Sequence, residues 1–324
     1  MQKKAWCCFV AVACALAGAL AHAQGRDFPN RPVRLVVPSS PGGIIDVVTR
    51  LLGQKLSEVM GQSVVIENRP GASTNIGTEI VARAPGNGYT LLTNTLPLVV
   101  NPSLFQKLPF DVEKDFAPVS LLVGAPYVLS AHLSVPVKSV KELVALAKAR
   151  PGVLNYASGG DGTNLHVAME LFRNMTGAQI VHLPYKGGGP ALASLVRGES
   201  DLSMLSLVAV LPHVNAGRVR ALAITDRRRT AMLPEVPTIA ESGVAGYEFT
   251  SGVGVLAPAS TPPAIIASLN GYVVKAMQAP DLSKRFANEG THVIASSPGQ
   301  FGAHLKTEIA RWAKVVKEAR IKLE

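Results

Sequence analysis

Short apolar runs alternate with amphipathic stretches along most of the chain. The β-rich run Val33–Val37 is followed by a segment whose apolar residues recur three and four positions apart from Ile44 to Val59. This periodicity predicts a helix with one buried face, and Gly61 marks its end. The order of strand, glycine-rich loop, helix and next strand then recurs. Such an order is typical of a parallel sheet with helices on its faces.

The same pattern predicts elements farther along the chain. Ser139 and Glu142 are spaced as a capping box, which favours a helix start at this point. Gly177 is expected to end a helix that contains Phe172. The expected strands lie at residues 64–66, 89–93, 154–157 and 180–183, and the expected helices at 76–84, 140–150, 165–172 and from 297 onward.

The composition changes at two places, near Leu121–Pro126 and near Gly246–Ala257. Two such changes predict that the chain passes twice between two lobes, as a hinge that lets the lobes close over a ligand. The expected first lobe comprises residues 24–123 and 248–324, and the second comprises residues 124–247. The expected fold class is α/β, with a mostly parallel sheet flanked by helices in each lobe.

The first 23 residues have the features of a secretion signal. Lys3 and Lys4 precede the apolar stretch Trp6–Leu20, and Ala21–Ala23 forms a small-x-small cleavage sequence. Cleavage after Ala23 is expected, with a periplasmic mature chain. A lone N-terminal anchor is the alternative, although the apolar stretch is short for a membrane span.

Cysteine usage and charge narrow the possible functions. Cys7, Cys8 and Cys14 all lie in the expected signal, so the mature chain offers no disulfide or thiolate. A lipid-modified Cys14 is a weaker alternative, because Ala11 stands where such signals carry a leucine-like residue. The net charge of +10 favours anionic ligands. Nucleic acid is not an expected partner, because the chain is predicted to be exported and the basic run Arg227–Arg229 has no aromatic neighbours for stacking.

Loops rich in Gly, Ser, Thr and Asn follow several predicted strands, at the end of the sheet where open α/β proteins bind ligands. Most of these loops lead into a helix, and the free N–H groups of a helix N-terminus bind anions. Glycine allows close backbone approach, and hydroxyl groups add uncharged donors. The ligand-binding residues predicted on these grounds are Pro41, Gly42, Gly43, Asp46, Ala72, Ser73, Thr74, Asn75, Thr93, Asn94, Ser158, Gly159, Gly160, Gly162, Thr163 and Lys186.

The two charged residues in this set have alternative explanations. Asp46 lies in the first turn of its helix, where a carboxylate caps the N-terminus and interacts favourably with the dipole. It could instead accept a ligand ammonium group or a bridging water. Lys186 could meet an anion or be solvated in a turn, and its run is no P-loop because the lysine precedes the glycines.

The sequence contains no arrangement that indicates catalysis or a metal site. The six histidines of the mature chain have no His-x-x-x-His or similar spacing. Ser158 lacks the Gly-x-Ser-x-Gly elbow, and no carboxylates are paired for acid–base work. His166 is expected to be a packing residue. No metal, cofactor or enzymatic activity is therefore expected, and an exported enzyme is the weakest of the functional alternatives.

Nine motifs, in matching order and spacing, resemble the Bug family of periplasmic substrate-binding proteins, which are associated with tripartite tricarboxylate transporters. These motifs are Arg31–Asp46, Val64–Ala72, Gly88–Leu92, Asn101–Asp111, Asp115–Leu122, His182–Ala191, Gly217–Thr225, Leu233–Gly243 and Leu256–Pro262.

This resemblance implies a two-lobed type II periplasmic-binding-protein fold that captures a small carboxylated solute between its lobes. It implies that the loops matched by Pro41–Gly43 and Ala72–Asn75 hold a carboxylate, partly through ordered water. The loop matched by Ser158–Thr163 contributes from the other lobe, with His166 just inside the helix. The implied partner is a two-subunit inner-membrane permease or, alternatively, a sensor kinase, and the receptor is expected to be a monomer.

The sequence departs from the family pattern near the expected pocket. Ser39-Ser40 replaces Phe-Pro or Phe-Ala, Ser73-Thr74 replaces two glycines, and Gly252 replaces a common tryptophan. Leu205-Ser206 replaces a Phe-Asp pair, so Ser206, at an expected pocket position, offers no carboxylate to a ligand amine. These departures favour a carboxylate without an amino group over an amino acid.

Overall fold

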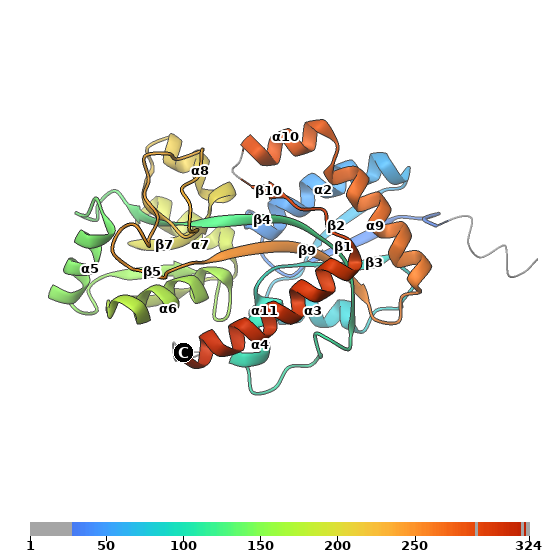
Figure 1. The fold of residues 1–324 in the computed structure, drawn as a ribbon, viewed down its shortest axis with the longest axis horizontal. Helices are drawn as coiled ribbons and strands as arrows, with labels where there is room; N and C mark the ends of the chain where they lie inside the picture. Colours follow the sequence, from blue (N-terminus) through green and yellow to red (C-terminus); the bar gives the residue numbers. More distant parts are fainter. Residues whose placement is uncertain (1–27, 289–290, 319–320, 322–324) are drawn as a thin grey trace, which may run out of the picture.

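The computed structural model of the protein describes residues 28–288, 291–318 and 321. The expected secretion signal and its cleavage site lie outside these residues. Within the described ranges, ten strands form one connected sheet in the order β2-β1-β3-β9-β4-β7-β5-β6, and β8 and β10 also pair with β4. Helices flank this sheet in two groups, one at each end of the molecule (Figure 1).

The first half of the sheet begins with three parallel strands, paired in the order β2-β1-β3. These strands are β1 (Val33–Val37), β2 (Val64–Asn68) and β3 (Thr90–Asn94). Val33, Leu35 and Val37 of β1 pack into one core and Val36 into another, so both faces of the strand are buried. This explains why Leu35, Val36 and Val37 are apolar in succession.

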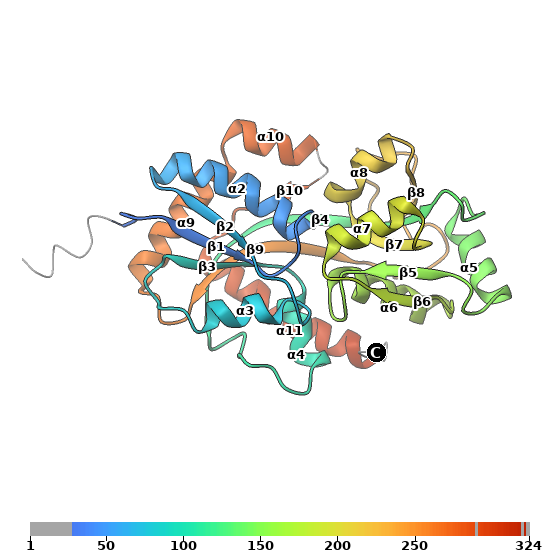
Figure 2. The same cartoon turned by 180° about the vertical axis from the view of Figure 1, so that it is seen from behind.

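Two helices connect these strands and cover opposite faces of the sheet, as the view from behind shows (Figure 2). They are α2 (Ile44–Met60) and α3 (Asn75–Ala82). Gly61 ends α2 with φ 65°, a left-handed conformation that glycine adopts without steric cost.

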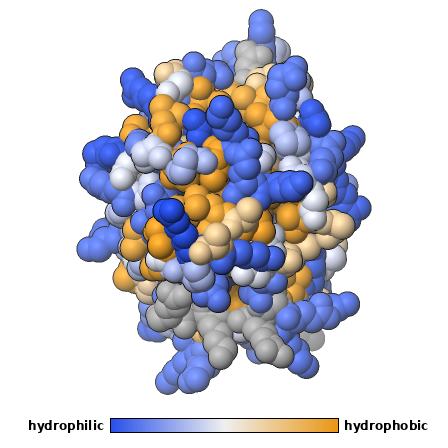
Figure 3. Space-filling model, turned by 90° about the vertical axis from the view of Figure 1, so that its left-hand side faces the viewer, coloured by the Kyte–Doolittle hydropathy of each residue, from blue (hydrophilic) through white to orange (hydrophobic). Residues whose placement is uncertain are grey.

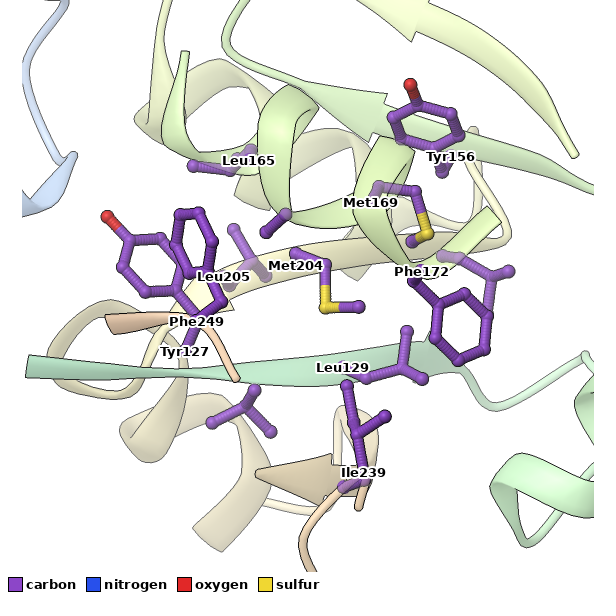
Figure 4. Close-up of a cluster of buried hydrophobic side chains, with 14 of the residues drawn as sticks. Tyr127, Leu129, Tyr156, Leu165, Met169, Phe172, Met204, Leu205, Ile239 and Phe249 are labelled. Carbon is purple, nitrogen blue, oxygen red and sulfur yellow. The ribbon is translucent and has the colours of Figure 1, made fainter. Parts of the chain in front are cut away.

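The second half of the sheet repeats this plan with a parallel set in the order β7-β5-β6. Its elements are α5 (Val140–Ala149), β5 (Asn155–Ser158), α6 (Asn164–Thr176), β6 (Val181–Pro184), α7 (Gly188–Arg197), β7 (Leu202–Ser206), α8 (Leu207–Asn215) and β8 (Val219–Ile224). Large side chains such as Tyr127, Phe172 and Phe249 fill the core between these elements (Figure 4).

Two long strands join the halves: β4 (Phe116–His132) and β9 (Thr250–Pro258). They pair antiparallel from Phe116 beside Pro258 to Pro126 beside Thr250. Beyond Pro126, β4 continues into the second half and pairs with β7 and β8. The first composition change in the sequence, Leu121–Pro126, lies within β4, and the second, Gly246–Ala257, overlaps β9. Because β4 and β9 run antiparallel to their neighbours, each half is parallel only away from the junction.

The remaining elements complete the covering layers. They are α4 (Pro97–Leu104), α9 (Pro263–Met277), α10 (Pro280–Asn288), β10 (His292–Val293) and α11 (Pro298–Glu318). Helices α9 and α10 share a core with α2, whereas α11 packs beside α4 and across β4. The ring of Trp312, near the end of α11, lies edge-on to Phe249 with 5.6 Å between centroids. Helix α11 therefore spans the junction of the two halves.

Most of the expected elements are present, including the cap of α5, where Ser139 Oγ accepts from the Glu142 backbone N–H at 3.2 Å. The expected helices do not include α4, α7, α8, α9 and α10. Helix α7 is not expected because glycines and a proline, as in Gly187–Pro190, are typical of a turn. In the structure α7 begins at Gly188. Pro190 lies in its first turn, where a missing N–H costs no helical hydrogen bond.

The surface at the end of the second half carries apolar patches broken up by hydrophilic side chains (Figure 3). No helix among the described residues combines the length and the apolar character that crossing a membrane requires.

Candidate ligand-binding site

A cavity of about 170 Å³ lies where strands from both halves end. A water molecule takes about 30 Å³ in the liquid, so the cavity has room for a small organic acid. Loops after β1, β2, β3, β5 and β6 line it, and Tyr127 of the junction strand β4 also contributes. This is the position at which open α/β sheets bind ligands. The lining residues are Pro38, Ser39, Gly43, Ile44, Ile45, Pro70, Gly71, Ala72, Ser73, Thr74, Thr95, Pro97, Tyr127, Gly159, Gly160, Thr163, Asn164, Leu165, Tyr185, Lys186, Gly187 and Gly188.

Four helices begin at this cavity, α2 and α3 from the first half and α6 and α7 from the second. Their first residues or N-caps line it, among them Ile44, Thr74, Asn164 and Gly188. No side chain caps any of these four N-termini. The positive ends of four helix dipoles therefore converge on one space, at helix N-termini that no side chain caps, and this favours a bound anion.

The loop before α3 is held in an unusual backbone conformation. Ala72, Ser73 and Thr74 have φ values of 45°, 53° and 76°, three left-handed residues in succession without a glycine among them. Each costs on the order of 1–3 kcal/mol, and such strain is characteristic of functional sites. No described residue accepts a hydrogen bond from the backbone N–H of any of the three. These N–H groups are therefore available to a ligand.

Two hydroxyl groups at the cavity are buried without a protein partner. Ser39 Oγ and Thr74 Oγ1 have no hydrogen bond to any described residue, and both residues line the cavity. A buried polar group left unpaired costs about 1–3 kcal/mol. A ligand oxygen that accepts from these hydroxyls would remove this penalty.

A buried polar network forms the floor between the two halves. Thr95 Oγ1 donates to Asn164 Oδ1 at 3.0 Å, and Asn164 Nδ2 donates to Ser251 Oγ at 2.8 Å and to the hydroxyl oxygen of Tyr127. Burial raises the pKa of Tyr127 well above its ordinary value, so its hydroxyl stays neutral. The network uses the hydrogen-bonding groups of Asn164 within the protein and positions the start of α6 against the first half.

The charge pattern of the cavity favours an anion. Among the described residues that line it, Lys186 alone carries a charged side chain, and none is a carboxylate. Lys186 is exposed to solvent. The apolar part of the cavity wall includes the side chains of Ile44, Ile45 and Leu165. The site therefore suits a small acid whose charged ends are joined by an apolar segment.

Loops from the two halves touch beside the cavity and close it on one side. Ser40 Oγ donates to the backbone oxygen of Lys186. The glycine backbones also meet, because a Cβ atom placed on Gly189 would lie 1.9 Å from the oxygen of Pro41 and one on Gly42 would lie 3.4 Å from the Cα of Gly189. Glycine is required at position 189 for this approach.

Eight of the residues predicted from the sequence line the cavity: Gly43, Ala72, Ser73, Thr74, Gly159, Gly160, Thr163 and Lys186. Pro41 and Gly42 lie beside it, in the contact with α7. Asn75 and Gly162 lie against Asn101, whose Nδ2 donates to Asn75 Oδ1 at 2.9 Å. A role of these last four residues in ligand binding stays a prediction.

The other predicted residues lie behind the lining. Thr93 Oγ1 accepts from Thr49 Oγ1 at 2.9 Å, and Asn94 Nδ2 donates to Thr78 Oγ1 at 3.0 Å, so both side chains bond within the first half. Ser206 is buried at the start of α8. Asp46, Ser158 and His166 are also outside the lining, and a direct contact with ligand stays a prediction for each of them.

Asp46 holds the first loop in place. Its carboxylate accepts from the backbone N–H of Gly42 at 3.0 Å, from Arg50 Nε at 3.0 Å and from Asn68 Nδ2 at 2.9 Å. Burial raises the pKa of Asp46, but the hydrogen bonds from Arg50, Asn68 and Gly42 outweigh this effect and leave the pKa below its ordinary value. These bonds give Asp46 a structural role, in which it fixes the loop before α2 and leaves the N–H groups of the first helical turn uncapped.

We expect Asp46→Asn to destabilise the protein at neutral pH by about 1–3 kcal/mol, since it weakens charge-assisted hydrogen bonds in a buried position. A carboxylate whose pKa is lowered by folding stabilises the fold above its unfolded pKa of 3.8. This stabilisation is lost as the pH falls through the lower folded pKa. The difference in unfolding free energy between wild type and variant should therefore shrink below about pH 4, as denaturant titrations across pH can measure. A difference that persists there would contradict this role.

Sequence reasoning missed several lining residues. Tyr127 lies on a junction strand, and nothing in its local pattern indicates that the strand passes the cavity. Asn164 directly follows the predicted loop that ends at Thr163, and extending that loop into the first helical turn would have included it. Tyr185 and Gly187 adjoin Lys186, and recognition of the start of α7 would have identified them.

Behind the loop after β5, the structure brings together residues that are far apart in sequence. His182 of β6 contacts Ser158 Oγ through Nε2 at 2.5 Å, and its Nδ1 lies 3.6 Å from Asp161 Oδ1. The rings of His166 and His182 lie 4.6 Å apart between centroids. Burial lowers the pKa of each histidine to about 4, so both rings are neutral at pH 7. The sequence spacing concealed this cluster, because it forms only when β5 and β6 pair.

The fold and cavity together define a two-lobed solute-binding protein. The sequence profile described as the tripartite tricarboxylate transporter family receptor matches residues 48–321, and the chain belongs to this family. Protein BugT of Bordetella pertussis is 38% identical over 312 residues, which cover 96% of each chain. This confirms the resemblance to the Bug family.

Solved structures confirm the fold class. Rpa4515 of R. palustris, solved with adipate, has a TM-score of 0.89 and 39% identity, over 92% of this chain and 100% of that one. MatC (Rpa3494) of Rhodopseudomonas palustris, with bound malate, has a TM-score of 0.86 and 32% identity, over 89% of this chain and 99% of that one. The periplasmic binding protein BugD has a TM-score of 0.89 and 30% identity, over 91% of this chain and 100% of that one.

Proposed function

We propose that this protein is a periplasmic receptor that captures a small dicarboxylate in the cavity between its halves and delivers it, unchanged, to a two-subunit permease of the inner membrane. The observation that carries this proposal is the convergence of four uncapped helix N-termini on a cavity without a lining carboxylate. The adipate of Rpa4515 and the malate of MatC support the choice of ligand class, because both are dicarboxylates.

Each half of the protein would hold one carboxylate. In the first half, Ser39 and the loop Ala72–Thr74 offer hydroxyl and backbone donors, together with the N-terminus of α2. In the second half, the N-termini of α6 and α7 and the cation of Lys186 face the other end of the ligand. The apolar side chains Ile44 and Leu165 would contact the segment between the carboxylates.

Closure of the two halves makes both sets of donors available at once. A hydrogen bond to a charged group contributes about 1.5–3 kcal/mol, so three or four of them, after the cost of ordering, support affinity in the micromolar range. The ligand must bind the closed state better than the open one, since only then does closure report the ligand to a permease.

Isothermal titration calorimetry with adipate, malate and aspartate tests the binding proposal. We expect adipate or malate to bind with a dissociation constant in the micromolar range. Aspartate should bind more weakly, because no carboxylate of the lining can pair with its ammonium group. Failure of all dicarboxylates to bind at millimolar concentration would contradict the proposal, and tighter binding of aspartate would contradict the assigned ligand class.

The Ser39→Ala variant tests the unpartnered hydroxyl. It should weaken dicarboxylate binding about tenfold, which corresponds to about 1.4 kcal/mol. The unfolding midpoint of the ligand-free protein should not fall, because the substitution removes a buried group that has no described protein partner. Thr261→Val is the matched control, since Thr261 Oγ1 is also buried and unpaired among the described residues but Thr261 does not line the cavity. Equal affinity in wild type and Ser39→Ala would remove this hydroxyl from the site.

Deletion of the gene distinguishes the two possible partners of the ligand-bound receptor, a permease and a sensor kinase. Loss of dicarboxylate uptake would support delivery to a permease. Normal uptake with lost induction of the genes for its use would instead support a sensor kinase as the partner and contradict the transport role.

A further inference from the structure

We propose that Asp161, His166 and His182 form a binding site for one divalent transition-metal ion, behind the loop that lines the carboxylate cavity. Asp161 lies in the loop after β5, His166 in the first turn of α6 and His182 in β6. One ligand atom from each of the three side chains lies within 4.8 Å of the other two. This site is separate from the proposed carboxylate site, because none of the three residues lines the cavity.

The distances are close to those of a metal site. Asp161 Oδ1 and His182 Nδ1 are 3.6 Å apart. In tetrahedral zinc sites the bonds to histidine nitrogen and carboxylate oxygen are about 2.0–2.2 Å, which places two ligand atoms about 3.3–3.5 Å apart. Asp161 and His182 could therefore ligate one metal ion after a small movement of their side chains. The His166 ring would have to move farther.

The surroundings of Asp161 favour a cation. Its Oδ1 atom is buried and accepts no hydrogen bond from any described residue. No Lys or Arg within the described ranges forms an ion pair with this carboxylate, and the ring nitrogen beside its Oδ1 atom is His182 Nδ1, 3.6 Å away. A buried carboxylate oxygen without a donor is unfavourable. A metal ion held between Asp161 and the two imidazole rings would supply the missing positive charge.

The bonds behind the histidines suit metal ligation. Ser158 Oγ lies 2.5 Å from His182 Nε2 and accepts a hydrogen bond from it in the tautomer that carries the ring proton on Nε2. In that tautomer His182 Nδ1, which lies 3.6 Å from Asp161 Oδ1, would be the nitrogen that ligates the metal, as in sites where the second ring nitrogen donates to a fixed acceptor. His166 Nδ1 accepts from the backbone N–H of Gly162 at 3.1 Å, and this ring would exchange that bond for coordination.

The donor set indicates which ions would bind. Two imidazole nitrogens and one carboxylate oxygen suit Zn²⁺, Ni²⁺ or Cu²⁺, whereas Mg²⁺ and Ca²⁺ prefer oxygen ligands alone. Three protein ligands leave a fourth position for water.

Calorimetric titration of ZnCl₂ into the mature full-length protein, with any affinity tag removed and no carboxylate present, tests the proposal. We expect one equivalent of zinc to bind with a micromolar or lower dissociation constant and to raise the unfolding midpoint. With Co²⁺ in place of zinc, the visible spectrum should be that of a tetrahedral or five-coordinate nitrogen–oxygen site. Heat no greater than that of dilution, together with the spectrum of the hexaaqua ion, would overturn the proposal.

The variant Asp161→Asn should weaken zinc binding at least tenfold, because it removes the charged ligand while keeping the shape of the side chain. His213→Gln is the matched control, since His213 Nδ1 is also buried without a described partner but lies on α8, away from the cluster. Equal zinc affinity in wild type and Asp161→Asn would assign the zinc to another place and overturn the proposal. If Asp161→Asn does not fold, the Co²⁺ spectrum of the wild-type protein decides the question. Because no organic acid is present, the result is independent of the proposed dicarboxylate function.

Discussion

Replacing Gly43 with aspartate is expected to reduce dicarboxylate affinity at least a hundredfold while leaving the protein folded. Gly43 is the N-cap of α2 and lines the cavity, with φ −81° and ψ 169°, a conformation open to any residue. A Cβ atom at this position meets its nearest neighbours, the Cα and N atoms of Gly188, at 3.6 Å, which is an ordinary van der Waals contact. Aspartate is a preferred N-cap, and its carboxylate would take the N–H groups of the first turn that a ligand would otherwise use.

The neutral variant Gly43→Asn is the matched control for Gly43→Asp. Asparagine has nearly the same shape and also caps helices, but it adds no negative charge. Calorimetry with adipate should therefore show a much smaller loss for Asn than for Asp. The hundredfold loss corresponds to about 2.7 kcal/mol. Unchanged affinity in Gly43→Asp, or equal losses in the two variants, would show that no anion binds at the start of α2.

Replacing Gly189 with alanine is expected to hold the two halves apart. The added Cβ would lie 1.9 Å from the Pro41 oxygen, which no small adjustment can relieve. Gly189 lies in the first turn of α7, and alanine has a higher helix propensity than glycine, so the second half should be no less stable. We expect dicarboxylate affinity to fall at least tenfold, because the closed state that completes the site becomes costly.

Small-angle X-ray scattering with and without adipate checks this result. The radius of gyration of wild type should decrease when the ligand is added, and that of Gly189→Ala should not. Gly271→Ala is the control, since a Cβ at this glycine of α9 has nothing within 4 Å. A variant that binds and compacts like wild type would show that the contact between Pro41 and Gly189 plays no part in closure.

The local elements could be predicted because each depends on residues close in sequence. The 3.6-residue period from Ile44 to Val59 and the helix-ending Gly61 define α2 before any tertiary contact is known. The repeated α/β pattern and the two composition changes predicted the two-lobed arrangement, and the Bug family motifs implied it as well. Helix α7 was missed because three glycines and a proline are typical of a turn. Here the glycines permit the close approach of another loop, a reason that only the tertiary structure reveals.

The candidate site could be predicted only in part, for a similar physical reason. Its loops follow parallel strands, so residues such as Gly43 and Thr163 were accessible to sequence reasoning. The contribution of Tyr127 depends on the course of a long junction strand, and the cluster of Asp161, His166 and His182 depends on the pairing of β5 with β6. The spacing of residues within one segment of the sequence does not show which strands pair or where a long strand passes.

A crystal structure of the protein grown with adipate tests the central claim most directly. The account predicts one adipate between the two halves, with one carboxylate on Ser39 and the loop Ala72–Thr74 and the other at the N-termini of α6 and α7. Adipate bound only on the outer surface, or a cavity that stays without adipate while the protein binds it in solution, would contradict the account.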